Sequence, residues 1–310
     1  MTLPVATRVP PVTRAIDTVP DTTGGPRNHG YRLGHKVERR EFQSGITFWP
    51  HMVRVRHRRV RRLRVRHLKN APILEALVDF RVTLPKDVDA ERFRALAEAV
   101  GDRYPIVEAM HSYQASITFQ PGTGKPMDAR TAEVHPGGYV FRSSDRLNVV
   151  QFRVDGFTYN RLRPYTSWDE LRPEILRLWG LYQRAARPET CSRITARYIN
   201  RIDVPWGGEL SDFLTAPPIL PEGFPDILTG FITRIIIHDP EPDVFASVTQ
   251  ASQVQMDPQS ASIILDIEAY RQSDVGALDK QVEPTLAGLH DMKNRIFFGS
   301  LTEDQLKRYE

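Results

Sequence analysis

Residues 73–84 have the sequence ILEALVDFRVTL, in which apolar positions alternate with mostly polar ones. The residues that point to one side are all apolar: Leu74, Ala76, Val78, Phe80 and Val82. The residues between them include three charged ones, namely Glu75, Asp79 and Arg81. A period of two is typical of a β-strand with one buried face and one wet face. The stretch therefore predicts a strand of an antiparallel sheet.

A helix, three strands and a second helix are predicted after this strand. Asp89 has the position of an N-cap and Gly101 that of a C-terminal glycine, so a helix is expected between them. Strands are expected at 106–119, 138–143 and 148–162. Ser167 and Glu170 then form a capping box, and apolar residues follow at helical spacing: Leu171, Ile175, Leu178 and Tyr182.

The same order of elements occurs again in the second half of the chain. A strand (193–204), a short helix from Ser211, three strands (228–238, 244–252, 262–270) and a long helix (277–298) are predicted. The expected fold class is therefore α+β, with antiparallel sheets covered on one face by long helices. The order indicates two strand–helix–three-strand–helix repeats, at 67–190 and 191–310. The halves do not align residue by residue, so a chance match in order is the alternative.

Composition predicts a globular protein of a reducing compartment. Apolar residues make up 40% and charged residues 26% of the 310, which is ordinary for a chain that builds a core. The sequence has no run of about 18 apolar residues and no secretory signal in its first thirty residues, so a cytoplasmic location without a membrane is expected. The single cysteine, Cys191, excludes an internal disulfide and a multi-cysteine zinc site.

The basic charge of the chain is concentrated at its N-terminus. Residues 1–69 hold sixteen Lys and Arg against four Asp and Glu. Because the whole chain has a net charge of +4, residues 70–310 have a net charge of −8. The basic pI therefore describes an extension attached to an acidic body, and nucleic-acid binding by the body through its overall charge is not expected.

Residues 1–66 are predicted to be a disordered basic extension, because they lack apolar periodicity. Their last fourteen residues, VRVRHRRVRRLRVR, contain eight arginines: Arg54, Arg56, Arg58, Arg59, Arg61, Arg62, Arg64 and Arg66. One interpretation is an arm that binds the phosphates of a nucleic acid. The alternatives are a solvated tail, or a translation start placed too early, since Met52 directly precedes the arginines.

A charged seam between the first strands of the two halves is the candidate binding site. Its residues come from the strands at 73–84 and 193–204: Glu75, Asp79, Arg197, Tyr198, Asn200 and Arg201. If the two strands are neighbours, Glu75 or Asp79 would pair with Arg197 or Arg201 and form a groove for a polar ligand. The alternative is a solvated sheet face with structural salt bridges. Asn200 shares its strand face with apolar residues and would need a hydrogen-bond partner if buried.

Other signals of chemistry are weak. Histidines 111, 135, 238 and 290 lack metal-ligand spacing, and the chain has no phosphate loop, nucleophile elbow or dinucleotide fingerprint. No metal, cofactor or catalytic residue is predicted. Residues 159–165 could form a small aromatic and basic patch for stacking on nucleic-acid bases, although packing of strand ends is the alternative.

Five stretches together resemble a known family: LKNAPILEALVDFRV (68–82), VVQFRVDGF (149–157), RPYTSWDEL (163–171), ARYINRIDVP (196–205) and LHDMKNRIFFGSLTEDQL (289–306). They are similar to a sporadically distributed family of uncharacterised prokaryotic proteins, which begins near the Asn-Ala-Pro-Ile motif. The resemblance implies an accessory role in a prokaryotic defence or toxin–antitoxin-type system. It also implies shared-site residues: Asn70, Pro72, Glu75, Tyr165, Trp168, Arg197, Tyr198, Asn200 and Arg201.

The expected function is that of a non-enzymatic intracellular binding or interaction protein with an unidentified protein partner. The first alternative is a nucleic-acid-associated protein that uses the arginine arm. The second is an enzyme acting on a polar small molecule at the seam of Glu75, Arg197 and Arg201.

Overall fold

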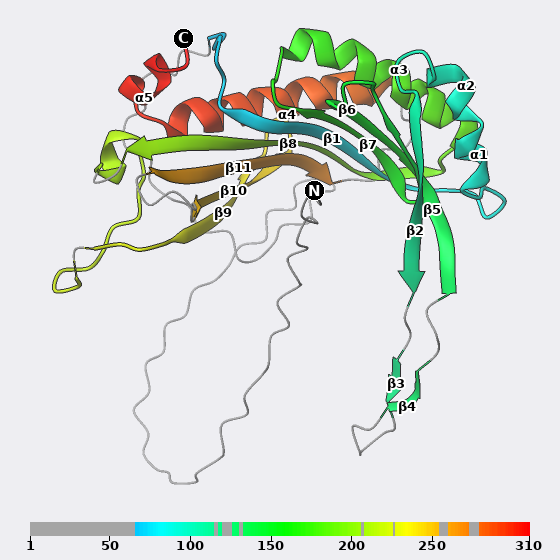
Figure 1. Cartoon of the computed structure of the whole chain (residues 1–310), viewed down its shortest axis with the longest axis horizontal. Helices are drawn as coiled ribbons and strands as arrows, with labels where there is room; N and C mark the ends of the chain where they lie inside the picture. Colours follow the sequence, from blue (N-terminus) through cyan, green and yellow to red (C-terminus); the bar gives the residue numbers. More distant parts are fainter. Residues whose placement is uncertain are drawn as a thin grey trace, which may run out of the picture. The chain divides into compact units, whose positions relative to one another are not determined.

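The computed structural model describes residues 66–114, 117–119, 126–129, 133–205, 208–225, 227–253, 260–272 and 279–310 (Figure 1). All of them belong to one compact unit, Arg58–Glu310. Its centre is an antiparallel sheet of nine strands in the order β2-β5-β6-β7-β1-β8-β11-β10-β9. The strands of this sheet are β1 (Ile73–Thr83), β2 (Ile106–Gln114), β5 (Glu133–Arg142), β6 (Asn148–Arg153), β7 (Gly156–Leu162), β8 (Thr190–Pro205), β9 (Ile232–Asp239), β10 (Val244–Gln253) and β11 (Ser260–Gln272). β3 (Ile117–Phe119) and β4 (Pro126–Ala129) form a separate pair.

The helices lie before, between and after these strands. They are α1 (Glu91–Arg94), α2 (Leu96–Val100), α3 (Trp168–Ala186), the 3₁₀ turn η1 (Leu210–Asp212), α4 (Asp279–Ser300) and α5 (Glu303–Lys307). Figure 1 shows α3 and α4 on the same face of the sheet. The α+β class and the antiparallel sheet with covering helices are thus confirmed, and both sets of strands belong to one sheet. Among the described residues, no helix is long and apolar enough to cross a bilayer.

The strand predicted from the alternating stretch is the middle strand of this sheet. β1 pairs antiparallel with β7 on one side and with β8 on the other. Ala76, Val78 and Phe80 are buried on the face covered by helices. Asp79 and Arg81 lie on the other face, which we call the open face, and Arg81 is exposed. A strand between two others loses access to solvent on its helix-covered face, which explains why its apolar positions are so regular.

Several boundaries differ from the predicted ones. The single strand predicted at 148–162 is a hairpin, β6 and β7, with a turn at Val154–Asp155. The first predicted helix is broken into α1 and α2 at Ala95, and the short helix from Ser211 is only the 3₁₀ turn η1. The Ser167 N-cap of the predicted capping box is confirmed, because the Ser167 hydroxyl accepts a hydrogen bond of 3.2 Å from the Glu170 amide.

The core lies between the helix-covered face and the two long helices. In the first half, Phe80 stacks on Trp179 of α3 with 4.2 Å between ring centroids. Tyr182 of α3 stacks on Phe93 of α1, and its hydroxyl donates to the Arg153 carbonyl. In the second half, α4 buries the apolar stripe expected for it: Val282, Leu286, Leu289 and Met292. Burial of these side chains provides most of the driving force for folding.

Candidate functional site

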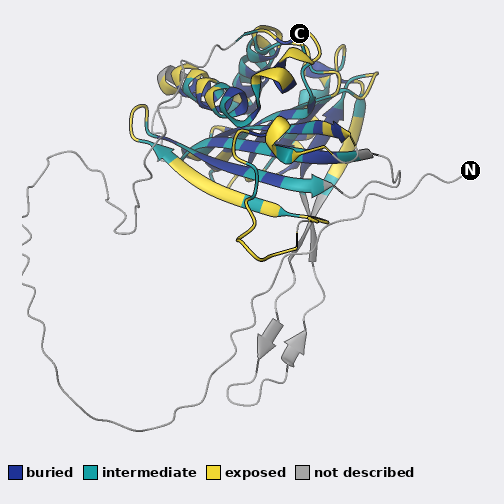
Figure 2. Ribbon diagram, turned by 90° about the vertical axis from the view of Figure 1, so that its left-hand side faces the viewer, coloured by how far each residue is buried: buried dark blue, intermediate teal, exposed yellow. Residues whose placement is uncertain are grey.

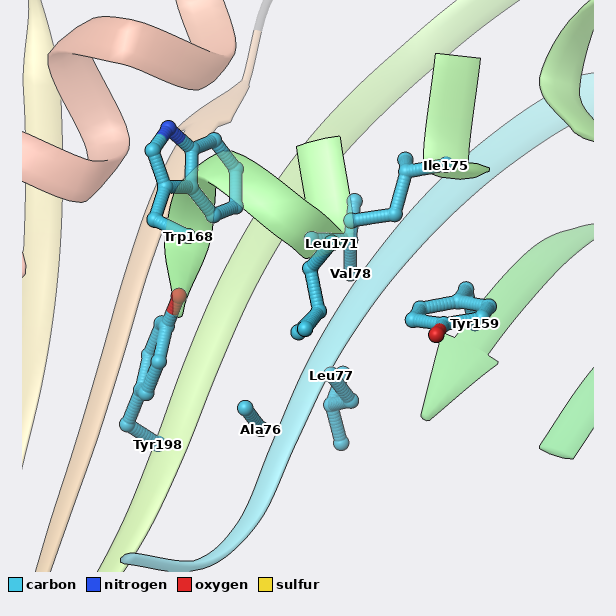
Figure 3. Close-up of a pocket in the computed structure, with 8 residues that line it drawn as sticks. All are labelled: Ala76, Leu77, Val78, Tyr159, Trp168, Leu171, Ile175 and Tyr198. Carbon is cyan, nitrogen blue, oxygen red and sulfur yellow. The ribbon is translucent and has the colours of Figure 1, made fainter. Parts of the chain in front are cut away.

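A pocket of about 290 Å³ lies where the N-terminus of α3 meets α4. Tyr165, Ser167 and Trp168 line it from the start of α3, and His290 and Lys293 line it from α4. Asn200 of β8 and apolar side chains such as Ile73 and Phe297 also line it. Pockets that bind small molecules in proteins have volumes from about 300 Å³ upwards, so this pocket is at the lower limit. The space between α3 and β1 next to it is filled by Leu171, Ile175 and Val78 and has no room for a water molecule (Figure 3).

Lys293 is the unusual residue of this pocket, because its charged side chain is only 7% exposed. Its Nζ donates a hydrogen bond of 2.7 Å to Asn294 Oδ1 and lies 4.1 Å from the centroid of the Tyr198 ring. Within the described part of the chain, no carboxylate forms an ion pair with it; Asp169, the acid that lines the pocket, is exposed. Burial lowers the pKa of the Lys293 ammonium from 10.5 to about 7.

The aromatic groups around Lys293 are neutral. His290 stacks on Trp168 with 4.6 Å between ring centroids, and burial together with the nearby Lys293 lowers the pKa of His290 to about 3. Tyr165 and Tyr198 share a hydrogen bond, and burial raises the pKa of Tyr165 to about 12 and that of Tyr198 well above its usual value. Figure 3 shows the Tyr198 hydroxyl directed towards Trp168. At pH 6, below the lowered pKa of Lys293, its cation is thus surrounded by uncharged rings.

Asn200 is a buried polar residue in the lining of the pocket. Its side chain is 1% exposed, and its Nδ2 donates to the carbonyls of Tyr198 (3.2 Å) and Leu265 (3.0 Å). Its Oδ1 is buried and has no hydrogen-bond partner. The prediction that a buried Asn200 needs partners is confirmed for its amide nitrogen, whereas its oxygen has none among the described residues.

The residues predicted to form one charged seam lie on two faces of the sheet. Tyr198 and Asn200 are buried on the helix-covered face, where Asn200 lines the pocket. Glu75, Asp79, Arg197 and Arg201 alternate with buried neighbours and therefore belong to the open face. A single site made of all six residues is therefore excluded by the geometry of the strands.

The expected pairs across the seam are replaced by others. Arg197 binds Asp266 of β11 through two hydrogen bonds of 2.9 and 2.6 Å. Arg201 pairs with Asp203 at 2.9 Å on its own strand. Asp79 accepts from Arg153 Nη2 at 3.0 Å and from Thr158 Oγ1 at 2.6 Å, and Glu75 accepts from Asn160 Nδ2 at 2.5 Å. The predicted pairing with Glu75 or Asp79 is wrong because β8 has a second neighbour, β11, and Asp266 of that strand lies within hydrogen-bond distance of Arg197.

A double-mutant cycle tests this assignment. Arg197→Met, Asp266→Asn and their combination should give a coupling of about 1 kcal/mol in the free energy of urea unfolding, since the pair is bidentate but partly exposed. A cycle of Arg197→Met with Glu75→Gln should give a smaller coupling. A larger coupling with Glu75 than with Asp266 would restore the pairing predicted from the sequence.

The predicted nucleic-acid arm lies mostly outside the described residues, whereas the patch at 159–165 is described. Of the eight arginines, Arg66 alone is among the described residues, and it pairs with Glu303 at 2.8 Å and Glu310 at 2.6 Å. The other seven lie outside the described residues. In the patch at 159–165, Tyr159 is buried and its hydroxyl donates to Asn148 Oδ1 at 2.8 Å. Tyr159 therefore has no face free for base stacking, and that part of the prediction is wrong.

Within the described part of the chain, His238 is paired and Cys191 is buried. Within the described residues, no three His, Cys, Asp or Glu side chains lie close enough together to hold a metal. His238 pairs with Asp243 at 2.8 Å, and the side chains of His111 and His135 lie outside the described part. Cys191 is fully buried, and burial raises the pKa of its thiol to about 12.

Sequence reasoning missed Lys293, His290 and Asn294 as candidate site residues. A signal was present, because Lys293 follows Leu286 and Leu289 on the apolar stripe of its helix. A lysine in this phase is expected to be buried, which is rare for an unpaired charge.

No protein-family model matches this sequence, and no curated protein matches it. The resemblance to an uncharacterised prokaryotic family therefore stays a prediction.

Proposed function

We propose that this chain is a binding protein that holds a small organic anion in the pocket between α3 and α4. The observation that carries the proposal is the buried Lys293 ammonium, which has no carboxylate partner among the described residues. Removing an ammonium from water costs several kcal/mol when it is left unpaired. An anion beside Nζ offsets this cost, so the pocket favours negatively charged ligands.

The other pocket residues limit the ligand further. Trp168 and its stacked neighbour His290 offer a flat apolar wall, which suits an aromatic or planar body. A planar carboxylate of the size of a substituted benzoate combines these features within about 290 Å³.

A matched pair of probes tests the proposal. Isothermal titration at pH 6.5 should show benzoate binding at least about tenfold more tightly than benzamide, because the two differ in charge and hardly in shape. Inorganic phosphate serves as an anion without an aromatic body, and we expect it to bind more weakly than benzoate. Equal affinity for benzoate and benzamide, or no binding of either anion at millimolar concentration, would contradict an anion site at Lys293.

We further propose that residues 67–190 and 191–310 are two structural repeats. In each half the first strand pairs with the last one: β1 with β7, and β8 with β11. β1 and β8 pair antiparallel in the middle of the sheet, as a two-fold axis between the halves would require. Each last strand is followed by a long helix, α3 or α4, and the pocket lies where these two helices meet.

A further inference from the structure

β9 is the last strand of the sheet and exposes an apolar edge. Among the described strands it pairs with β10 alone, so its other side is open. Figure 2 shows this strand in yellow along the edge of the body. Its exposed isoleucines are Ile232 (74%), Ile235 (57%), Ile236 (61%) and Ile237 (38%).

Such an edge is unusual for a protein that stays monomeric. Free edge strands are normally protected by proline, by a bulge or by charged side chains, because their unpaired N–H and C=O groups bind other strands. The segment Ile235–Ile237 has none of these features, and its pairing with β10 runs without a register shift. Three successive isoleucines also place apolar groups on both faces of the strand, so a covering partner must meet both faces. A strand of another sheet, added along this edge, presents side chains on both faces and so meets both.

The sequence of β9 indicates that this strand is a second copy of β9. Around Ile236 the apolar core of the strand is symmetric, with Ile235 and Ile237 at equal distances, and polar residues flank it on both sides: Arg234 and His238, then Thr233 and Asp239. An antiparallel copy related by a two-fold axis through Ile236, perpendicular to the sheet, would place each of these residues opposite its match. If the axis passed through Ile235 or Ile237 instead, Ile236 would lie opposite Arg234 or His238. If it passed midway between two residues, each side chain would lie opposite one that points to the other face of the sheet.

Charge also favours this register. Arg234 lies on β9 without an ion-pair partner among the described residues, and its Nε donates to Ser247 Oγ at 2.9 Å. In the symmetric register it would face His238 of the second copy, which is bonded to the carboxylate of Asp243 at 2.8 Å. The two-fold axis repeats this contact, so two arginines approach two Asp243 carboxylates.

We propose that the protein forms a symmetric dimer in which two β9 strands pair antiparallel about Ile236 and join two nine-stranded sheets into one of eighteen. The contact combines main-chain hydrogen bonds with matched isoleucines on both faces. It lies on β9 and is independent of the ligand pocket, so either proposal can fail without the other.

Sedimentation-velocity ultracentrifugation of the full chain tests the dimer. The wild type should sediment as a dimer at micromolar concentration, and Ile236→Lys should dissociate roughly 100-fold more readily, since the axis places two ammonium groups opposite each other. A one-to-one mixture of Ile236→Lys and Ile236→Glu should restore the dimer. The matched control is Ile219→Lys, at an 89% exposed position outside the strand, which should leave association unchanged.

A second measurement does not depend on the variants. Hydrogen exchange of the wild type should show the β9 amides becoming more protected as protein concentration rises, while the β2 amides stay unchanged. A wild type that is monomeric throughout the micromolar range would overturn the proposal. So would an Ile236→Lys variant that associates as strongly as the wild type.

Discussion

Lys293→Met is expected to stabilise the protein and to abolish its preference for anions. Methionine has nearly the length of lysine and carries no charge, so the substitution removes the cost of a buried ammonium without opening a cavity. Each unit of pKa shift corresponds to about 1.4 kcal/mol. The lowering of the Lys293 pKa from 10.5 to about 7, less the lost contacts with Asn294 and Tyr198, predicts a gain of ~2–4 kcal/mol at pH 6.

The gain in stability from Lys293→Met should become smaller as pH rises. The pKa of Lys293 is lower in the folded than in the unfolded chain, so the unfolded chain binds more protons between pH 7 and 10.5. Wild-type stability therefore rises through this window relative to the variant, and the advantage of Lys293→Met shrinks as pH increases. Urea unfolding of both proteins at pH 6, 8 and 10 measures this difference, in which the other titrating groups cancel.

Lys307→Met is the matched control for this experiment. Lys307 is exposed and pairs with Asp304 at 2.8 Å, so its replacement should leave the free energy of unfolding unchanged within experimental error. Benzoate titration of the same three proteins links stability to binding: Lys293→Met should bind benzoate no better than benzamide, and Lys307→Met should behave as the wild type. A Lys293→Met variant that is less stable at pH 6 would show that Lys293 has a structural role instead.

The strands could be predicted where burial of one face of the sheet requires apolar residues at every second position. β1 alternates from Ala76 to Thr83 because helices cover one of its faces and solvent meets the other, and the Ser167 cap of α3 is a local signal. The hairpin of β6 and β7 was missed although the phase of burial changes within it. Val150 and Phe152 are buried at even positions, whereas Phe157 and Tyr159 are buried at odd ones. A continuous strand cannot change its phase in this way, so the turn was readable from the residue parity.

The pocket could not be predicted, because it depends on contacts between distant parts of the chain. The helical phase of Lys293 predicts that the residue is buried, but it does not show that Trp168 and Asn200 surround the same space. The predicted ion pairs of the open face were wrong for the same reason. Arg197 lies 69 residues from Asp266, and only the strand order β1-β8-β11 shows that this acid is its neighbour.

Phe80→Ala is expected to be the most destabilising of the substitutions considered. Phe80 is fully buried in the middle strand, stacks on Trp179 at 4.2 Å and lies 5.7 Å from the ring of Phe157. Its removal loses the transfer free energy of the ring and leaves a cavity that rigid neighbours cannot fill, at a cost of about 3–5 kcal/mol. The loss should appear as a lower urea midpoint with an unchanged m-value.

Phe224→Ala is the matched control for Phe80→Ala, because it makes the same chemical change at an exposed position. Phe224 is 57% exposed, so the same change there should alter the free energy of unfolding by at most about 0.5 kcal/mol. β1 pairs with β7 of its own half and with β8 of the other half, so the cavity at Phe80 should weaken both halves at once. Unfolding followed by tryptophan fluorescence and by far-ultraviolet circular dichroism should then shift together. Separate shifts of the two signals would show that the halves unfold independently and that β1 does not couple them.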